Sequence, residues 1–484
     1  MGVTTMKNSI IFLLVAYLAV LALSTGVQAK LVTKDEAATI AKNWVAYMIH
    51  KKGDWNGEKS AYVDEILEFK RGERLLGYYC TVVPNGFVIV SLLKEWAPVK
   101  AYSSATDLDP YFDEGMTDLL KACLERLLIP AEDRLGPLEA ASSDDLGNLL
   151  GTSNRRAWEE IEQGVDMNYS EGDTLVDSNW HQGDPYNSWC PAPPPGDDCT
   201  DPRCLVGCVA TAGAQIMKYW NWPPYGVSAG WDDPYDWINM PNLLYTSSPQ
   251  AQINATAELC YEIGVAVGMG YCNSDGCQSG VPTLNMVPVY QNYYRYYPWV
   301  NTLYRAAGSQ INWFDAIKTQ VNQNRPIHYR VEGHSIVCDG WREIGSTPLR
   351  QYHMNYGWAD GATTWYSIDS LIYGTVEEYM LTNIFPTQSI GGYSMGSNYP
   401  LPAFPYRYFD QDISGTVSSF DAGHYLQFLP DVTVSCEAGT GNNIRFLSTS
   451  GANTRMFTRG DISKGARLQG GAIKLGPGGS LRFN

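Results

Sequence analysis

The sequence predicts an α+β fold, in which a helical segment precedes an antiparallel sheet. Apolar residues recur at helical spacing from Val209 to Tyr219, and Pro223 and Pro224 end that run. From Ile327 to about Thr382 the apolar period changes to two, which is typical of strands with one buried face. This change of period divides the centre of the chain into a helical half and a sheet half.

Composition and charge indicate a globular protein of several domains. Hydrophobic residues make up 44% of the 484 residues and charged residues only 18%, so the chain can bury a core. Single cores rarely grow beyond about 250 residues, and the length therefore allows about three domains. The net charge of −17 argues against nucleic acid and anionic membranes as partners, because both bind basic patches.

Residues 1–29 have the pattern of a secretory signal peptide. Lys7 precedes an apolar run from Ile10 to Leu23, and Ala29 ends a small-residue cleavage pattern. The run is shorter than the ~20 apolar residues of a spanning helix, so a membrane anchor is the weaker alternative and no later stretch could span a bilayer. We therefore expect a secreted protein, either extracellular or at the cell surface.

Residues 30–170 are expected to form a first α+β unit. Thr33 and Glu36 have the spacing of a capping box ahead of an amphipathic helix. A second helix is expected near residues 117–128, closed by Pro130. Between these helices, Asn-Gly at 85–86 separates two β-branched runs and predicts a hairpin.

No cluster of catalytic side chains occurs in this first unit, so taken alone it would be a binding domain. Residues 151–173 follow the expected helices and are rich in charge. We expect this stretch to be an exposed junction without a core, open to proteolysis.

Cys208 begins the predicted central helix. Unpaired N–H groups and the helix dipole stabilise a thiolate at that position. The ordinary alternative is a cysteine that serves as a small buried apolar side chain. Two distant segments favour a nucleophile, because His334 lies on a predicted strand and Asn355 lies on the next one.

With these residues the chain resembles the streptopain-like family of secreted cysteine peptidases. The family motifs Gly-Cys-Val-Ala-Thr-Ala, Gly-His-x-x-Val-x-Asp-Gly and Asn-x-Gly-Trp match at residues 207–212, 333–340 and 355–358. A further match covers residues 180–187, so four motifs occur in order within residues 178–385. The first unit resembles the family's propeptide more loosely.

The resemblance implies a papain-like catalytic domain and a role for each motif residue. Cys208 would be the nucleophile, His334 the general base, Gln182 the oxyanion-hole donor and Asn355 the residue that orients the imidazole. No metal or organic cofactor is implied. The substrates would be proteins or peptides, and the first unit would be an intramolecular inhibitor that makes the chain a zymogen.

The resemblance also implies residues around the dyad. Ser279, Gly280 and Gly333 would border the substrate. Tyr356 and Trp358 would shield the hydrogen bond of the orienting Asn from water, which strengthens that bond. The family usually has Trp where this chain has Tyr356.

His353 is a second candidate base, because strand alternation places it on the same face as Asn355. A hairpin that turns through residues 341–348 would set His334 opposite Asn355 and His353 opposite Ile336. On that register we expect His334 to be the base and His353 to be a structural residue.

The 11 cysteines of an exported chain fit one free thiol and up to five disulfides. Two of Cys190, Cys199 and Cys204 could pair, and Cys272 is expected to pair with Cys277 in a Gly-rich loop. Zinc is the weaker explanation of the first cluster, because no two Cys-x-x-Cys pairs occur at finger-like spacing.

We therefore expect five regions and one main function. The regions are a signal peptide (1–29), a propeptide-like domain (30–170), a papain-like peptidase domain (171–386), a Gly- and Pro-rich linker (387–413) and a small β-rich C-terminal module (414–484). The function is that of a secreted cysteine endopeptidase made as a zymogen. The alternatives are a secreted Cys-dependent acyltransferase or transpeptidase, and a catalytically silent adhesin on the same fold.

Overall fold

The structure is a computed structural model that describes most of the chain up to residue 385. The described residues are 31–150, 154–196, 199, 201–223, 235–274, 277–294, 296–308, 310–359 and 362–385, followed by short strand segments between 406 and 482. The expected signal peptide and most of the expected linker lie outside them. None of the described helices is long and apolar enough to cross a membrane.

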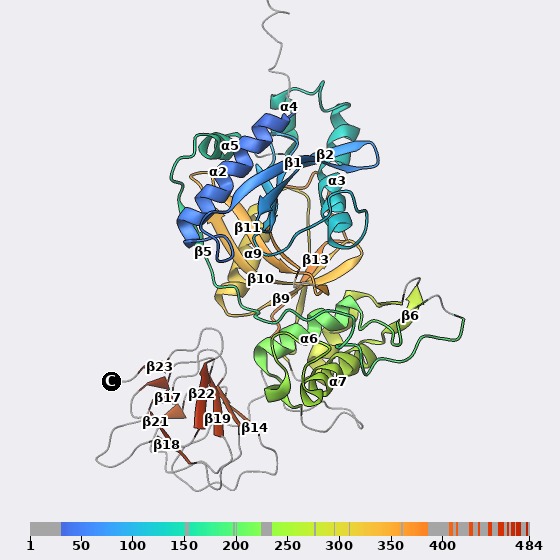
Figure 1. Cartoon of the computed structure of the whole chain (residues 1–484), viewed down its shortest axis with the longest axis vertical. Coiled ribbons are helices and arrows are strands. Elements are labelled where there is room, and N and C mark those ends of the chain that lie inside the picture. The colour runs from blue at the N-terminus through green and yellow to red at the C-terminus, as the bar shows by residue number, and fades with distance from the viewer. Residues whose placement is uncertain are drawn as a thin grey trace, which may run out of the picture.

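One antiparallel sheet runs through the first unit and the expected peptidase domain (Figure 1). Its strands are β1 (Tyr62–Arg71), β2 (Arg74–Val83), β3 (Phe87–Ser91), β4 (Val99–Ser103), β8 (Asn301–Tyr304), β9 (Ile327–Val331), β10 (His334–Ile344), β11 (Leu349–Asn355), β12 (Thr363–Ser367) and β13 (Tyr379–Thr382). They lie in the order β1-β2-β3-β4-β12-β11-β10-β9-β13-β8, and β5 (Tyr169–Glu171) also pairs with β10. The two regions meet where β4 pairs with β12, at Tyr102 with Trp365 and Ala101 with Tyr366.

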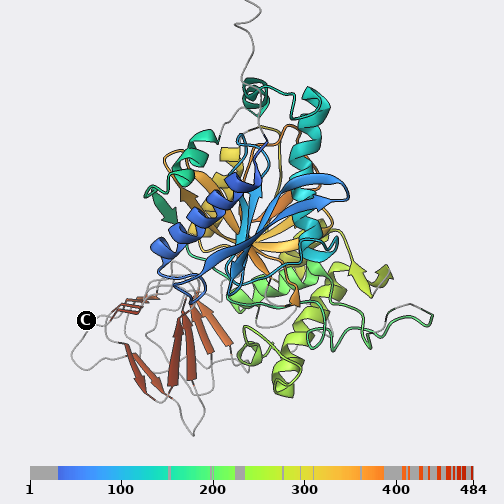
Figure 2. The same ribbon diagram turned by 45° about the horizontal axis from the view of Figure 1, so that its top comes forward.

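The first unit has the helices that its sequence predicts, and two more. They are α2 (Lys34–Lys52), α3 (Gly115–Leu135), α4 (Ser143–Leu150) and α5 (Arg155–Glu162). The capping box of α2 is confirmed, since Thr33 Oγ1 accepts from Glu36 N–H and Glu36 accepts from Thr33 N–H. The hairpin of β2 and β3 around Gly86 is confirmed as well, and Figure 2 shows α2 lying against the N-terminal strands.

Two expectations for this unit are wrong. Helix α3 does not end before Pro130 but continues to Leu135, where burial of Leu128 and Ala131 on both sides of the proline favours the helical course. The charged stretch after residue 151 does bury a core, because Trp158 of α5 is fully buried and donates from Nε1 to the Trp96 carbonyl at 2.9 Å.

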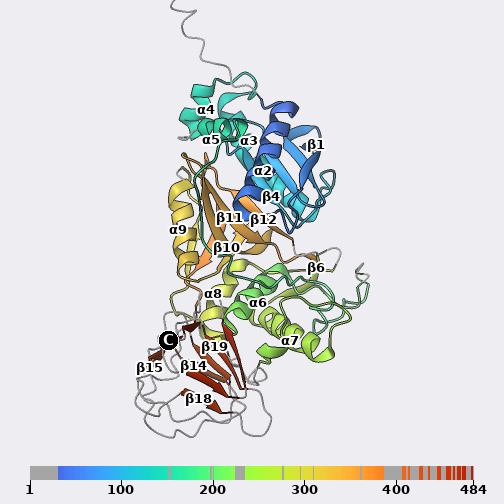
Figure 3. The ribbon, with the colours of Figure 1, turned by 60° about the vertical axis from the view of Figure 1, so that its left-hand side comes forward.

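The second region places its helices on two sides of the sheet. Helix α9 (Gln310–Asn322) packs on β10 and β11, whereas α6 (Cys208–Trp220) and α7 (Gln250–Val267) pack together at the end of the sheet (Figure 3). The predicted helix starting with Cys208 and the antiparallel strands after Ile327 are both confirmed.

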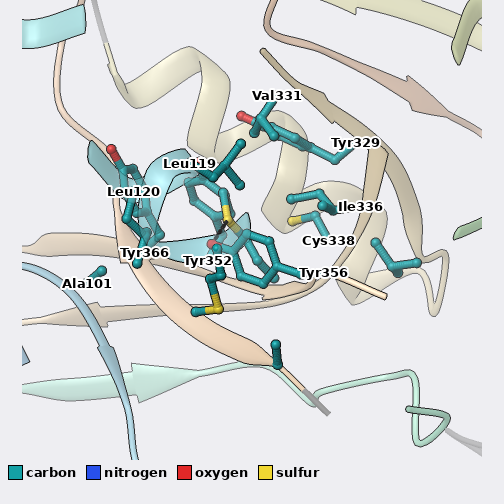
Figure 4. Close-up of a cluster of buried hydrophobic side chains, with 14 of the residues drawn as sticks. Ala101, Leu119, Leu120, Tyr329, Val331, Ile336, Cys338, Tyr352, Tyr356 and Tyr366 are labelled. Carbon is teal, nitrogen blue, oxygen red and sulfur yellow. Dashed lines mark hydrogen bonds between the residues drawn. The ribbon is translucent and has the colours of Figure 1, made fainter. Parts of the chain in front are cut away.

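The first unit is packed tightly onto the second region. Figure 4 shows Leu119 and Leu120 of α3 in a buried cluster with Tyr329, Tyr352 and Tyr366 of the sheet. Two ion pairs cross the same interface. Lys100 Nζ lies 2.5 Å from Asp369 with both side chains 2% exposed, and Arg126 lies 2.9 Å from Glu378. Separation of the two regions would therefore expose apolar surface and leave buried charges unpaired.

Beyond residue 405 the described backbone consists of strands that pair in parallel. One sheet contains β14 (Tyr406–Phe409), β16 (Tyr425–Phe428), β19 (Thr454–Thr458) and β22 (Gly471–Leu475). A second contains β15 (Ile413–Ser414), β17 (Val434–Ser435), β20 (Ile462–Ser463) and β23 (Leu481–Arg482), and β18 (Ile444–Leu447) pairs with β21 (Ala466–Gln469). The chain contributes strands to these sheets in turn, and the neighbouring strands of each sheet pair in parallel.

Candidate active site

Cys208 is the first residue of α6 and lies at the edge of the core. Cys208 is partly exposed as a residue, whereas every following residue of the helix is buried. Gly207 precedes it with a φ of +87°, and a Cβ there would lie 2.6 Å from Met269 Sδ. Only glycine fits this approach, which sets the start of the helix and the position of the thiol.

His334 begins β10 and meets Cys208 across the end of the sheet. Its imidazole makes a hydrogen bond with the thiol. Its Nε2 lies 2.7 Å from the Tyr356 carbonyl oxygen. A carbonyl oxygen only accepts, so Nε2 carries a proton and Nδ1 is the nitrogen left for the sulfur.

The surroundings of Cys208 favour the thiolate. Burial would raise the pKa of the thiol, but the nearby His334 charge, its hydrogen bond and the Ser335 N–H outweigh burial, so the pKa of Cys208 is lowered. Burial instead raises the pKa of Cys80 and of Cys190 to about 12. Among the free cysteines of the described chain, Cys208 alone has a lowered pKa.

Among the described residues no hydrogen bond joins Asn355 to His334, so the expected hydrogen bond from Asn355 to the imidazole is wrong. Its amide pairs with that of Gln215, and its Nδ2 donates to the Ser178 carbonyl at 2.8 Å. Its Oδ1 also accepts from the Gly357 N–H at 3.1 Å. The Tyr356 carbonyl makes the hydrogen bond with the imidazole that the sequence predicts for the Asn355 side chain.

The strand register explains this difference. β10 continues through Trp341 to Ile344, so the turn comes at residues 345–348 and not from residue 341 onward. Asn355 is therefore opposite Val337, and His334 pairs with Val331 of β9. The predicted pairing of His334 with Asn355 is wrong.

His353 is opposite Gly340, not opposite Ile336 as predicted. Its Nδ1 lies 2.6 Å from Asp339 Oδ1, and its ring packs on Trp365 with centroids 5.2 Å apart. A bulge at Asp339 produces this register and turns the carboxylate toward the imidazole.

Gln182 is half-buried in the loop that approaches the start of α6. Its main-chain carbonyl accepts from the Val206 N–H at 2.9 Å, two residues before Cys208. The same loop is fixed at Trp180, which is fully buried and whose Nε1 donates to the Pro241 carbonyl at 2.9 Å. The structure thus brings the Gln182 loop beside the segment that leads into Cys208.

The residues expected to border the substrate lie on a short strand and in the turn directly before His334. Ser279 and Gly280 belong to β7 (Gln278–Gly280), which pairs with β6 (Gly270–Ser274). The Ser279 carbonyl lies 3.0 Å from the Cβ position of Gly207, so β7 packs against the start of α6. Gly333 is exposed in the turn directly before His334.

Two aromatic rings cover His334 in series. Trp358 stacks on the imidazole with centroids 4.3 Å apart and planes at 19°, and Tyr356 stacks on Trp358 at 5.5 Å and 7°. The Tyr356 hydroxyl finds a partner in Thr364 Oγ1 at 2.9 Å. Trp358 is therefore the ring in direct contact with the imidazole, and Tyr356 supports it.

The disulfides differ from expectation. Cys199 pairs with Cys277, and Cys204 pairs with Cys272, so the predicted Cys272–Cys277 bond is wrong. The segment before Cys208 runs beside the β6–β7 hairpin, which gives each thiol its nearest partner in the other segment. Within the described residues no three His, Cys, Asp or Glu side chains gather as a metal site.

Gln215 is a residue of the site that the sequence motifs did not identify. It lies seven residues after Cys208 and is fully buried in a mostly apolar helix. A lone buried amide two helical turns from the thiol was the available signal, because a buried amide must find partners.

Comparison with known proteins adds independent findings. Residues 180–366 match the model of the Peptidase C10 family, and residues 29–127 match the model of the Spi protease inhibitor. Streptopain of Streptococcus pyogenes is 26% identical over 352 residues, which cover 65% of this chain and 80% of streptopain. The thiol protease/hemagglutinin PrtT of Porphyromonas gingivalis is 22% identical over 359 residues, which cover 68% of this chain and 38% of PrtT.

Two solved structures from Prevotella intermedia are also similar. A mutant fragment of prointerpain A is 19% identical with a TM-score of 0.48, and the match covers 67% of this chain and 99% of the fragment. Active wild-type interpain A is 24% identical with a TM-score of 0.36, and the match covers 44% of this chain and 95% of that protein.

Proposed function

Because the chain is a streptopain-like cysteine endopeptidase with an inhibitor-type N-terminal segment, we propose that it is exported as a zymogen in which Cys208 is the nucleophile and His334 the general base. The contact between Cys208 and His334 carries this proposal, since it lowers the pKa of the thiol. Export is supported by the signal-peptide pattern of residues 1–29.

The proposed reaction has two steps. The Cys208 thiolate attacks the scissile carbonyl carbon and forms a C–S bond, and Nδ1–H of the His334 imidazolium then protonates the leaving amine. In the second step Nδ1 takes a proton from water, whose oxygen attacks the thioester and releases the acid and the thiolate. Nε2–H remains hydrogen-bonded to the Tyr356 carbonyl oxygen in both steps. This hydrogen bond stabilises the positively charged imidazolium.

The oxyanion of each tetrahedral intermediate needs donors near the start of α6. The Cys208 N–H is available there, and Gln182 is carried by the loop bonded to Val206. One such donor typically supplies about 3 kcal/mol of transition-state stabilisation. Gln182→Ala should therefore lower kcat strongly while Cys208 keeps its reactivity toward small alkylating agents.

We expect the first unit to inhibit the peptidase by blocking access of the substrate, and not by separating His334 from Cys208. The Cys208–His334 contact is present while β4 is still paired with β12. The buried pairs Lys100–Asp369 and Arg126–Glu378 support a first unit that stays docked until the chain is cut.

The proposed activation cut lies at residues 163–166, a narrower segment than the 151–173 expected from the sequence. Asn43 of α2 donates to the Ile161 carbonyl at 2.8 Å, and the Tyr47 hydroxyl donates to the Met167 carbonyl at 3.3 Å. Helix α2 is thus hydrogen-bonded to the chain on both sides of this segment, while residues 163–166 themselves are exposed. The sheet lies between α5 and α6 in Figures 1 and 3, so we expect a second copy to make the cut.

A processing experiment tests this proposal. The Cys208→Ala precursor cannot cut itself, so it is mixed with a trace of active enzyme and the new N-terminus is sequenced. We expect a new N-terminus among residues 164–167. Full activity of an intact precursor, or cuts only elsewhere, would contradict the zymogen scheme, and mass analysis with a competing amine would reveal acyl transfer in place of hydrolysis.

A further inference from the structure

We infer that Gln215 is a positioning residue of this peptidase, which holds Asn355 and through it the backbone turn that binds His334. The inference rests on the proposed roles of Cys208 and His334. It concerns a residue of the helix that begins with Cys208, whose hydrogen bonds within the described chain go to Asn355, Trp180 and Ser178.

The bonds of Gln215 join three separate parts of the site. Its Nε2 donates to Asn355 Oδ1 at 3.2 Å, and its Oε1 accepts from Asn355 Nδ2 at 3.1 Å. The same Oε1 accepts from the Trp180 N–H at 3.2 Å and from Ser178 Oγ at 3.3 Å. One fully buried amide on α6 therefore fixes the end of β11 and the loop that leads to Gln182.

The connection continues from Asn355 to the imidazole. Asn355 Oδ1 accepts from the Gly357 N–H at 3.1 Å, and Gly357 has a φ of +66°. A Cβ at Gly357 would lie 3.0 Å from Thr211 Cγ2 of α6, so the turn is pressed closely against the nucleophile helix. This turn sets the Tyr356 carbonyl at 2.7 Å from His334 Nε2.

The placement of that carbonyl has an electrostatic consequence. A carbonyl oxygen that accepts from Nε2–H stabilises the imidazolium more than the neutral ring, because the bond to a charged donor is stronger. The imidazolium in turn stabilises the Cys208 thiolate. If the turn loosens, the imidazolium should stabilise the Cys208 thiolate less, so the thiolate should form only at higher pH.

The chain offers a matched control in Gln320 of α9. It is 8% exposed, its Nε2 donates to Asn383 Oδ1 at 3.1 Å, and its Oε1 accepts from the Asn383 N–H at 2.9 Å. Like Gln215 with Asn355, this pair joins a helical glutamine to an asparagine by two hydrogen bonds, although one of them comes from the Asn383 backbone, and it is not connected to the dyad by the contacts described above. A general loss of stability should affect both positions alike.

The experiment compares Gln215→Met and Gln320→Met in the processed enzyme. Methionine keeps the length of the side chain and removes its hydrogen bonds. We expect Gln215→Met to lower kcat by roughly ten- to a hundred-fold through misplacement of the imidazole, with KM little changed. The acid limb of the pH profile of Cys208 alkylation by iodoacetamide should move to higher pH, whereas Gln320→Met should leave both measurements as in the wild type.

Two further variants keep the inference falsifiable. Gln215→Glu is for use if the methionine variant does not fold. It still accepts from Asn355, Trp180 and Ser178 but cannot donate to Asn355 Oδ1, so it should shift the alkylation profile less. The double variant Gln215→Met with Asn355→Leu should be no worse than the more damaging single variant.

A wild-type pH profile in folded Gln215→Met or Gln215→Glu, or additive effects in the double variant, would overturn the inference. A wild-type Cys208 that does not react below pH 7 would instead overturn the proposed function on which it rests.

Discussion

Two histidine sites on the β10–β11 hairpin share most of their parts. His334 and His353 each pack on a tryptophan, Trp358 in one case and Trp365 in the other. Each imidazole also has a close oxygen, which is the Tyr356 carbonyl for His334 and the Asp339 carboxylate for His353. On these features His353 looks the better base, because it has the carboxylate.

The difference lies in what each site faces. His334 meets the start of α6 and its thiol, whereas the Asp339 carboxylate of the second site accepts from the Val176 N–H at 2.8 Å. The His353 site thus fastens the chain segment that follows the junction. An imidazole with a close oxygen therefore has a structural role at His353, whereas at His334 the start of α6 places a thiol next to the ring.

Replacement of the two imidazoles should give the largest contrast. His334→Ala removes the group that lowers the pKa of Cys208, so the thiolate should form only at higher pH and casein degradation should fall by roughly 10²–10⁴-fold. His353→Ala should keep the alkylation profile of Cys208. Loss of activity in His353→Ala with retention in His334→Ala would reverse the assignment.

Removal of the carboxylate should affect stability more than chemistry. Asp339→Ala leaves the His353 imidazole and the Val176 N–H without their buried acceptor, at a cost of about 1–3 kcal/mol for each group. Chemical denaturation should show this loss, while the reactivity of Cys208 in the folded variant stays unchanged. A folded Asp339→Ala protein with an unreactive Cys208 would mean that the two sites are not independent.

The motif residues could be placed from the sequence because their positions depend on local structure. A helix start at Cys208 and strands at His334 and Asn355 follow from short-range periodicity and are confirmed. The strand register could not be predicted, because it depends on where β10 ends. Since β10 continues to Ile344, Asn355 lies opposite Val337 and not opposite His334.

Residue pairs that join distant segments of the chain also could not be predicted from the sequence. The disulfides of Cys272 and Cys277 depend on the segment before Cys208, which the loop sequence itself does not indicate. The pairing of Gln215 with Asn355 joins residues 140 positions apart. Helix α5 was missed for a different reason, since its charges concealed the spacing of Ala157, Trp158 and Ile161.

The two rings over His334 should give smaller and unequal effects. Trp358→Ala uncovers one face of the imidazole and should lower kcat more than Tyr356→Ala, which removes only the ring behind it. Tyr356→Phe should cost only about 0.5–1.5 kcal/mol of stability through the lost bond to Thr364. Tyr356→Trp should be tolerated, and equal kcat values for the two alanine variants would mean that direct contact with His334 is not what matters.

The most direct test of the account is the alkylation of each free cysteine as a function of pH. The folded protein is treated with iodoacetamide from pH 5 to pH 10, and the modified cysteines are mapped by mass spectrometry. Because the pKa of Cys208 is lowered and burial raises that of Cys190, Cys208 should react rapidly below pH 7 while Cys190 stays unmodified until the chain unfolds. Reaction of Cys208 only at the pH of an ordinary thiol, or earlier modification of another cysteine with activity retained, would contradict the assignment of Cys208 as the nucleophile.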